Sequence, residues 1–272
     1  MTNNSSLLES TEFLDELPLW SAPFGLKLLD CIEYKPNIKV IDIGTGNGFP
    51  LIEIAMRLGV GSYVYGIDPW EEALIRAENK IKHIGLSNIE LIKGYAESIP
   101  LKDKSIDLIT SNNGLNNVDD LDKVISECAR IAKPGAQFIQ TMNLDDTMFE
   151  FYGHFAQVLS YMHLYNEIEQ MHQHIYQKRR PVEELVSIIR NNGFIIKDLE
   201  HNQFNYKFTN GTAFLNHSLI RAAFMDSWLN LIPEGKHEII FDAIESRLNE
   251  QARLLGGLKL SIPFVLINAI KA

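Results

Sequence analysis

The stretch Ile38-Lys39-Val40-Ile41-Asp42-Ile43-Gly44-Thr45-Gly46-Asn47-Gly48 decides the fold. Its first six residues are rich in β-branched side chains, which predicts a buried strand. The three glycines that follow predict a tight turn, because glycine adopts positive φ angles and lets a ligand approach bare backbone. A helix should begin near Pro50, since proline is tolerated in a first helical turn, and end at Gly59. The unbonded N–H groups at the start of such a helix favour an anionic ligand group.

Strands and helices alternate beyond this segment. The spacing of apolar residues predicts further strands at residues 63–68, 89–94, 106–110 and 137–142. Helices are predicted at residues 71–85 and 121–132, and Lys133-Pro134-Gly135 predicts a turn before the last of these strands. Strands separated by helices imply a parallel, doubly wound sheet.

The segments on either side of this region do not alternate regularly between strand and helix. At the N-terminal end, residues 12–32 predict two short helices around the apolar turn at residues 19–25. Further helices are expected from about residue 145 to 174 and at residues 181–191, 212–231 and 235–255, with strands at residues 194–199 and 258–267. Pro263 lies inside the last strand and favours a bulge or an edge position.

We therefore predict an α/β fold with a Rossmann-like, doubly wound and mostly parallel seven-stranded sheet and helical cap insertions. Three regions follow from the pattern: an N-terminal helical lid at residues 1–35, a core at residues 36–145, and helical cap insertions with the last sheet strands at residues 146–272. The cap insertions should cover the carboxyl ends of the strands, where such sheets bind their ligands.

Composition narrows the class of partner. Twenty-five basic side chains against 35 acidic ones give a net charge of -10, which would repel a phosphate backbone, so we expect no nucleic-acid partner. The first residues lack the pattern of a secretory signal, and no apolar run approaches the roughly 20 residues of a membrane span, so we expect a cytoplasmic protein without a membrane partner. The two cysteines lack metal or redox spacing.

The spacing of the glycines limits the class of ligand that the turn can bind. Dinucleotide-binding proteins use G-x-G-x-x-G at this place, whereas this chain has G-x-G-x-G and carries Phe49 where the third dinucleotide glycine would stand. Asp68 ends the second strand twenty residues after Gly48, where a carboxylate can accept both hydroxyls of a ribose. An adenosine-containing ligand fits these features.

Four ordered motifs resemble those of the class I S-adenosylmethionine (SAM)-dependent methyltransferases, in particular the small-molecule branch of quinone and sterol methyltransferases. They are residues 40–48, Gly66-Ile67-Asp68-Pro69, Gly94-Tyr95-Ala96-Glu97-Ser98-Ile99-Pro100 with residues 106–110, and Lys133-Pro134-Gly135-Ala136. The resemblance implies that residues 36–145 bind SAM: the glycine loop its methionine part, Asp68 its ribose, and Pro69 or Trp70, Ala96 and Glu97 its adenine. The cofactor residues expected in this way are Asp42, Gly44, Thr45, Gly46, Gly48, Asp68, Pro69, Trp70, Ala96, Glu97 and Asn112.

The same resemblance places the acceptor near the loop after the fourth strand. We expect Trp20, Asn113, Asn116 and Asn117 to face it. Asparagine cannot act as a base at neutral pH, which favours an acceptor that is already nucleophilic, or a base located elsewhere. His154 and His217 are the candidates for that base. No metal is expected, because His172 and His174 are two residues apart and point in different directions on a helix.

Several alternatives stay open at this point. Lys178-Arg179-Arg180 could recognise an acidic acceptor or form a solvent-facing helix end. An NAD(P)-dependent oxidoreductase would use the same fold, but the glycine spacing and the lack of a clear Tyr-x-x-x-Lys pair speak against it. A non-catalytic SAM-binding subunit is the third reading. The acceptor, the methylated atom and the choice between monomer and homodimer stay open.

Overall fold

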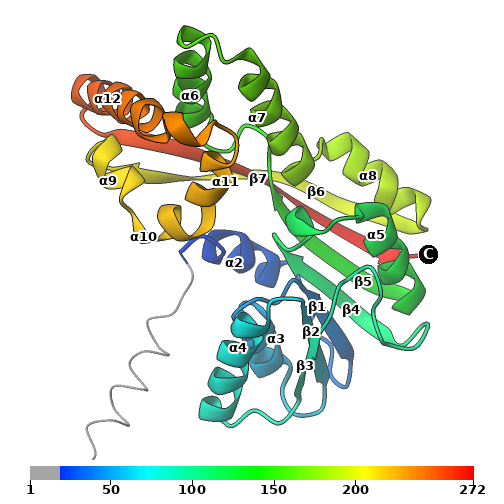
Figure 1. Ribbon diagram of the computed structural model, residues 1–272. Coiled ribbons are helices and arrows are strands. Elements are labelled where there is room, and N and C mark those ends of the chain that lie inside the picture. The colour runs from blue at the N-terminus through cyan, green and yellow to red at the C-terminus, as the bar shows by residue number, and fades with distance from the viewer. Residues whose placement is uncertain (1–18) are drawn as a thin grey trace, which may run out of the picture. The chain divides into compact units, whose positions relative to one another are not determined.

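The computed structural model describes residues 19–272, so the first of the two predicted N-terminal helices lies outside the described residues (Figure 1). The chain forms two compact units. Unit 1 contains residues 19–142, Val182–His201 and Val265–Ala272, and unit 2 contains Asn143–Pro181 and Asn202–Phe264. The predicted division into a lid at residues 1–35, a SAM-binding core at residues 36–145 and a cap region at residues 146–272 stays a prediction.

Seven strands form one sheet in the order β3-β2-β1-β4-β5-β7-β6. The strands are β1 (Lys39–Ile43), β2 (Tyr63–Asp68), β3 (Ile89–Lys93), β4 (Ile106–Asn112), β5 (Ala132–Asn143), β6 (Phe194–Phe208) and β7 (Leu258–Lys271). Strand β1 pairs in parallel with β2 and β4, and the pairs β2–β3 and β4–β5 are parallel as well. The chain order reverses at β1, so the predicted mostly parallel, doubly wound sheet is confirmed.

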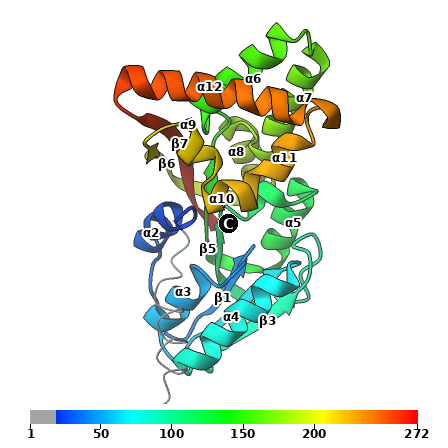
Figure 2. The ribbon, with the colours of Figure 1, turned by 60° about the vertical axis from the view of Figure 1, so that its left-hand side comes forward.

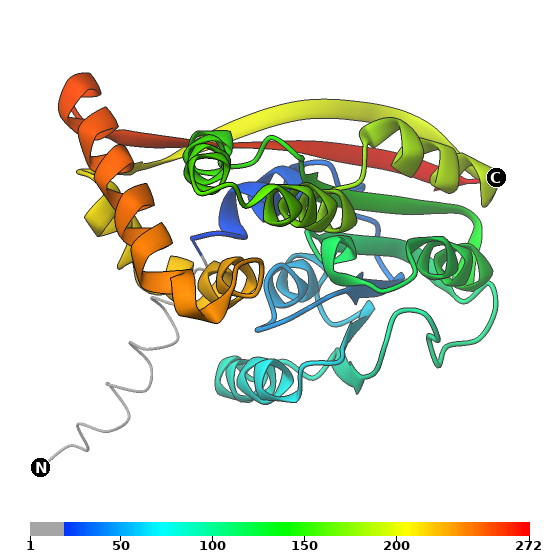
Figure 3. The ribbon, with the colours of Figure 1, turned by 45° about the horizontal axis from the view of Figure 1, so that its top comes forward.

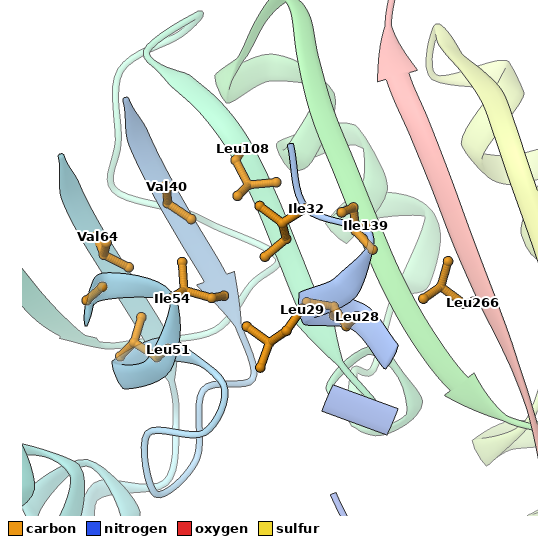
Figure 4. Packing of buried hydrophobic residues seen from close by; sticks show 11 residues of the cluster. Leu28, Leu29, Ile32, Val40, Leu51, Ile54, Val64, Leu108, Ile139 and Leu266 are labelled. Carbon is orange, nitrogen blue, oxygen red and sulfur yellow. The ribbon is translucent and has the colours of Figure 1, made fainter. Parts of the chain in front are cut away.

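Helices α2 (Ala22–Asp30) and α3 (Leu51–Leu58) cover one face of the sheet of unit 1. Figure 4 shows Leu28 and Leu29 of α2 and Ile54 of α3 against Val40 and Leu108 of the strands, all of them buried in one apolar cluster. Helix α4 (Glu71–Ile84) packs against β3. Helix α5 (Leu121–Ile131), on the other side of the strands from α2 and α3 in Figure 2, contacts α8 (Val182–Asn191).

Unit 2 is mainly helical. Its elements are α6 (Phe149–Tyr161), α7 (Tyr165–Lys178), α9 (Gly211–Leu215), α10 (Ser218–Ile220), a π-helical turn (Arg221–Met225), α11 (Asp226–Leu229), a 3₁₀ turn (Glu234–Lys236) and α12 (His237–Leu255). The long helix α12 contacts α6 and α9 (Figure 3). Phe151, Phe155, Phe214 and Trp228 are fully buried and form an aromatic core. These side chains therefore pack the unit together.

The predicted single helix from residue 145 to 174 is wrong, because the chain turns between α6 and α7. His163 adopts a left-handed conformation with φ of 57°. The N–H of Leu164 bonds to the carbonyl of Leu159, and that of His163 to the carbonyl of Ser160, which is a Schellman arrangement. Glycine is the usual residue at such a position, so the sequence carries no visible stop signal.

The predicted helix at residues 212–231 is also wrong in its continuity, since it divides at Asn216 and again at the π-helical turn. The predicted apolar turn at residues 19–25 ends earlier, because Pro23 already lies in the first turn of α2. Strand β6 runs to Phe208 instead of residue 199. Strand β7 lies between β5 and β6, so the edge position expected for Pro263 is wrong.

The predicted turn at residues 133–135 is an irregularity inside β5. Ile106 pairs with Ala132 and Leu108 with Gln137, so the residues between the two β5 positions bulge out of register. Gly135 has φ of 79°, which accounts for the turn-like sequence at this point. Among residues 19–272, the structure contains no helix of the length and hydrophobicity that a membrane span needs.

Candidate functional site

A cavity of about 450 Å³ in unit 1 lies at the carboxyl ends of β1, β2 and β4. Its lining includes the predicted residues Gly44, Gly46, Asp68, Pro69, Trp70, Ala96, Glu97, Asn112, Asn113 and Asn117. The other lining residues were not among the predicted site residues: Ile43, Ile67, Gly94, Tyr95, Gly114, Val118 and Asp119. Each of these lies within two positions of a predicted residue in the sequence, so extending every motif by two positions on either side would have found them.

The glycine turn is held open by close backbone packing. Gly44, Gly46 and Gly48 have φ of 72°, 50° and 95°, which L side chains rarely adopt. A Cβ on Gly44 would lie 2.7 Å from the Cα of Gly114, so the two loops touch at their backbones. A Cβ on Gly46 would meet nothing within 4 Å, because this residue borders the cavity. Bare peptide groups at Gly46 are therefore accessible to a ligand.

Asp68 connects the glycine turn with helix α4. Its Oδ2 accepts a hydrogen bond from the N–H of Gly46 at 2.9 Å, and its Oδ1 accepts one from the N–H of Trp70 at 2.9 Å. A carboxylate has about four lone-pair directions, so two remain for a ligand. The half-buried carboxylate borders the cavity and can accept two hydroxyl groups there.

Asp42 and Thr45 are buried and are not among the lining residues. The hydroxyl of Thr110 donates to Asp42 Oδ1 at 2.7 Å. Burial raises the pKa of Asp42 to about 7, although the hydrogen bond from Thr110 opposes the rise. Gly48 is likewise not among the lining residues, and its missing side chain makes room for Ile52. The structure therefore gives these residues a place in the support of the turn.

An aromatic residue, Trp70, and an acidic residue, Glu97, also border the cavity. Trp70 is 59% exposed and borders the cavity, so its side chain is accessible to a ligand there. Glu97 Oε1 accepts hydrogen bonds from the N–H groups of Asp119 at 3.0 Å and Asp120 at 3.3 Å. Glu97 thereby ties the loop at residues 94–97 to the start of α5. Ala96 lies between them and is buried.

The predicted acceptor loop begins later than expected, because Ser111 and Asn112 belong to β4. Asn112 Nδ2 donates to the carbonyl of Ser21 at 3.1 Å, and its Oδ1 accepts from Thr141 Oγ1 at 3.0 Å. Asn112 thus fastens the start of α2 to the strands. Asn113, in a left-handed conformation with φ of 61°, bonds through its N–H to the carbonyl of Thr141.

The remaining residues predicted to face the acceptor differ in their exposure. Asn117 borders the cavity, whereas Asn116 is buried and is not among the lining residues. Trp20 is half-buried just before α2, and its ring contacts that of Phe24 edge-on at 5.5 Å between centroids. The structure therefore brings Asn113 and Asn117 to the cavity and leaves Asn116 and Trp20 outside its lining.

Both histidines predicted as possible bases belong to unit 2. His154 Nε2 lies 2.7 Å from Oε1 of Gln251, and the ring of His217, which precedes α10, contacts that of Phe208 at 5.4 Å. Neither borders the cavity of unit 1. Within the described range 19–272, no three His, Cys, Asp or Glu side chains come together in a way that could hold a metal ion.

Comparison with known proteins finds similarity to methyltransferases. A family model described as a methyltransferase domain matches residues 34–209. Demethylmenaquinone methyltransferase of Bacillus cytotoxicus is 33% identical over 120 residues, which cover 44% of this chain and 51% of that protein. The enzyme of the same description from Geobacillus kaustophilus is 35% identical over 113 residues, or 42% of this chain and 48% of that protein. The chain thus spans about half the length of the curated relatives it matches.

Solved structures share the fold over most of the chain. The YcgJ protein from Bacillus subtilis has a TM-score of 0.59 and 19% identity, covering 91% of this chain and 97% of that chain. A SAM-dependent methyltransferase from Aquifex aeolicus has a TM-score of 0.51 and 23% identity, covering 70% of this chain and 90% of that chain. At these identities the likeness is one of fold.

Proposed function

Because the chain belongs to the family of methyltransferase domains, we propose that it transfers a methyl group from SAM to a small-molecule acceptor. One observation carries the proposal: the Asp68 carboxylate and the bare backbone of Gly46 border the same cavity and are hydrogen-bonded to each other. A ribose and the polar end of an amino acid need these two kinds of group.

The residues present fit SAM. The cavity volume of about 450 Å³ lies within the range of roughly 300 to 1,000 Å³ that is usual for small-molecule sites. The N–H groups of Gly44, Thr45, Gly46 and Gly48 are bonded within the chain, so the glycine turn would hold the methionine part mainly through its open backbone and peptide oxygens. Asp68 suits the ribose, and Trp70 with Ala96 suits the adenine. Glu97 is hydrogen-bonded to the loop at residues 119–120. We therefore propose two roles for Glu97: it holds that loop in place, and it lies beside the adenine.

In the proposed mechanism the protein acts mainly by positioning. Bound SAM supplies a methyl group on a positively charged sulfur, which is already activated for displacement by a nucleophile. Asp68 fixes the ribose end, and the glycine turn fixes the methionine end, so the two together orient the reactive centre between them. Holding two reactants in line can supply much of the rate acceleration in such a reaction.

No base is required if the acceptor is already nucleophilic. Among the lining residues, Asn112, Asn113 and Asn117 can orient an acceptor by hydrogen bonds but cannot remove its proton. We therefore propose an acceptor that is nucleophilic without help from a base of this cavity, as an ionised quinol or enol is. The matched relatives are demethylmenaquinone methyltransferases, so a quinol-like acceptor is the first specific candidate.

Two alternatives predict different ligands. An NAD(P)-dependent oxidoreductase would bind a nicotinamide dinucleotide, yet Phe49 stands where the third dinucleotide glycine is needed. A non-catalytic subunit would bind SAM without turnover. Calorimetric titration distinguishes the oxidoreductase from a methyltransferase. Incubation with methyl-labelled SAM and a panel of acceptors distinguishes the non-catalytic subunit from an active enzyme.

The deciding experiment is titration of the purified chain with S-adenosylhomocysteine and, separately, with NADH. We expect micromolar binding of S-adenosylhomocysteine and an approximately hundredfold loss in Asp68→Ala, since two hydrogen bonds to a charged group contribute about 1.5 kcal/mol each. Asp107→Ala is the matched control, because Asp107 accepts an N–H bond from Lys39 at 2.9 Å outside the cavity. Preference for NADH, or equal loss in both variants, would contradict the proposal.

A further inference from the structure

Arg179 follows the last residue of α7 in unit 2 and is buried, with only 6% of its surface exposed. The solvent-facing position considered for this basic cluster is therefore wrong for Arg179. Its Nη1 is buried and makes no hydrogen bond. A guanidinium carries five N–H donors, and burying a charged donor without an acceptor is strongly unfavourable. The position of Arg179 therefore needs an explanation beyond a helix end.

The guanidinium lies over an aromatic ring that is itself fixed. Arg179 Cζ is 5.6 Å from the ring centroid of Tyr152. The hydroxyl of Tyr152 accepts a hydrogen bond from Trp228 Nε1 at 3.0 Å, and the Tyr152 ring packs edge-on against Phe151. Contact with a ring face stabilises the positive charge but uses none of the in-plane N–H donors. Nη1 is therefore held in place with an unused N–H donor.

No carboxylate within the described residues forms an ion pair with Arg179. Asp146 is an acidic neighbour: partial burial of its carboxyl group raises the pKa of Asp146, and the charge of Arg179 opposes the rise. His174 is a second titratable neighbour. Burial lowers the pKa of His174 most, and the positive charges of Arg179 and Lys178 lower it further. Asp146, His174 and Lys178 are thus titratable neighbours of Arg179, and none of them neutralises its charge in an ion pair within the described residues.

We propose that Arg179 is an anion-binding residue of unit 2 that takes a carboxylate or phosphate group of a small molecule. The planar guanidinium can donate two parallel N–H bonds to either group, and an exchangeable ligand would supply the missing acceptor. This anion site lies within unit 2 and goes beyond the methyl transfer proposed for the cavity of unit 1.

Arg180 provides a matched control next to Arg179. Its Cζ also lies over a tyrosine, 4.9 Å from the ring centroid of Tyr176, and its Nη1 donates to the hydroxyl of Tyr176 at 3.2 Å. Arg180 is only half-buried, so water can reach its side chain. The two arginines share charge, neighbouring position and aromatic contact, but only Arg179 is buried with an unused donor.

The test is calorimetric titration of the full chain with benzoate, phenyl phosphate and inorganic phosphate at constant ionic strength, with benzamide as the uncharged comparison. We expect at least one of the anions to bind and benzamide not to bind. Arg179→Met should weaken anion binding at least tenfold, Arg179→Lys should weaken it less because it keeps the charge without the planar donors, and Arg180→Met should leave it unchanged. Preference for benzoate or for the two phosphates identifies the ligand class.

Measurement of the same variants with S-adenosylhomocysteine separates this inference from the proposed function. Binding of S-adenosylhomocysteine that persists in Arg179→Met, together with lost anion binding, supports both. The inference is overturned if the wild-type chain binds none of the three anions, or if Arg180→Met and Arg179→Met lose binding equally. A melting temperature of Arg179→Met at or above the wild-type value shows that the variant is folded, and it is expected because a buried unpaired charge is removed.

Discussion

Replacement of Asp42 by asparagine should change how stability depends on pH. Asp42 is fully buried below the glycine turn and accepts one hydrogen bond from Thr110 at 2.7 Å. Asparagine keeps an oxygen that can accept this bond and removes the titratable group. The substitution therefore isolates the free energy of unfolding that depends on the charge of Asp42.

The magnitude follows from the raised pKa. Burial moves the pKa of Asp42 from 3.8 to about 7, so between these values the folded chain holds a proton that the unfolded chain has lost. The stabilising effect is complete below the lower value and is lost as pH rises through the upper one, by about 4 kcal/mol in total at 1.36 kcal/mol per pKa unit. About 2.5 kcal/mol of this loss falls between pH 5 and pH 8.

Urea denaturation of the wild type and Asp42→Asn at pH 5 and pH 8 measures this difference. The stability of the variant relative to the wild type should increase by about 2.5 kcal/mol between the two pH values. Thr110→Val should extend the pH-dependent loss of stability to higher pH, because the hydroxyl that supports the ionised carboxylate is gone and the pKa of Asp42 rises further. A constant difference between wild type and Asp42→Asn across this range would refute the reasoning.

Three further predictions concern the turn, the core and the thiols. Gly114→Ala should weaken S-adenosylhomocysteine binding by roughly tenfold or more, since the new Cβ would collide with the carbonyl oxygen of Ile43 and displace the turn; unchanged calorimetric affinity would contradict this. Asn88→Ala should lower the free energy of unfolding in urea by about 2 kcal/mol and leave that affinity intact, because the buried Asn88 amide donates to three carbonyl groups remote from the cavity. Burial raises the pKa of both thiols, so native iodoacetamide labelling should be slow at half-buried Cys31 and absent at fully buried Cys128 until urea is added; early labelling of Cys128 would disprove the burial.

The core of the fold could be predicted because its signals are local. Apolar runs of five or six residues that end in glycine or aspartate mark the first two strands, and helices with clear apolar faces separate them. Parallel strands end at one edge of the sheet, so the strand order was enough to predict that the glycine turn and Asp68 lie at the same edge. The hydrogen bond between Gly46 and Asp68 is a detail that the sequence did not predict.

The parts that failed depend on contacts distant in sequence or on an unusual residue. His163 ends a helix where glycine would be expected, and no local pattern reveals it. The extension of β6 did carry a signal, because Phe204, Tyr206 and Phe208 alternate with polar residues at the period of a strand. The burial of Asn116 under its loop depends on packing that periodicity does not describe.

Asp42 and Arg179 share a property that sequence patterns do not report. Each is an ionisable side chain in a buried position, one in each unit, and each reduces the stability of the folded chain when charged and unpaired. Apolar residues of similar volume would pack such positions at lower free energy. Departures of this kind from the rules of folding are expected where a chain binds ligands. If both substitutions stabilise the chain at pH 8 while Arg179→Met loses anion binding, the charge of Arg179 is retained for binding at the expense of stability.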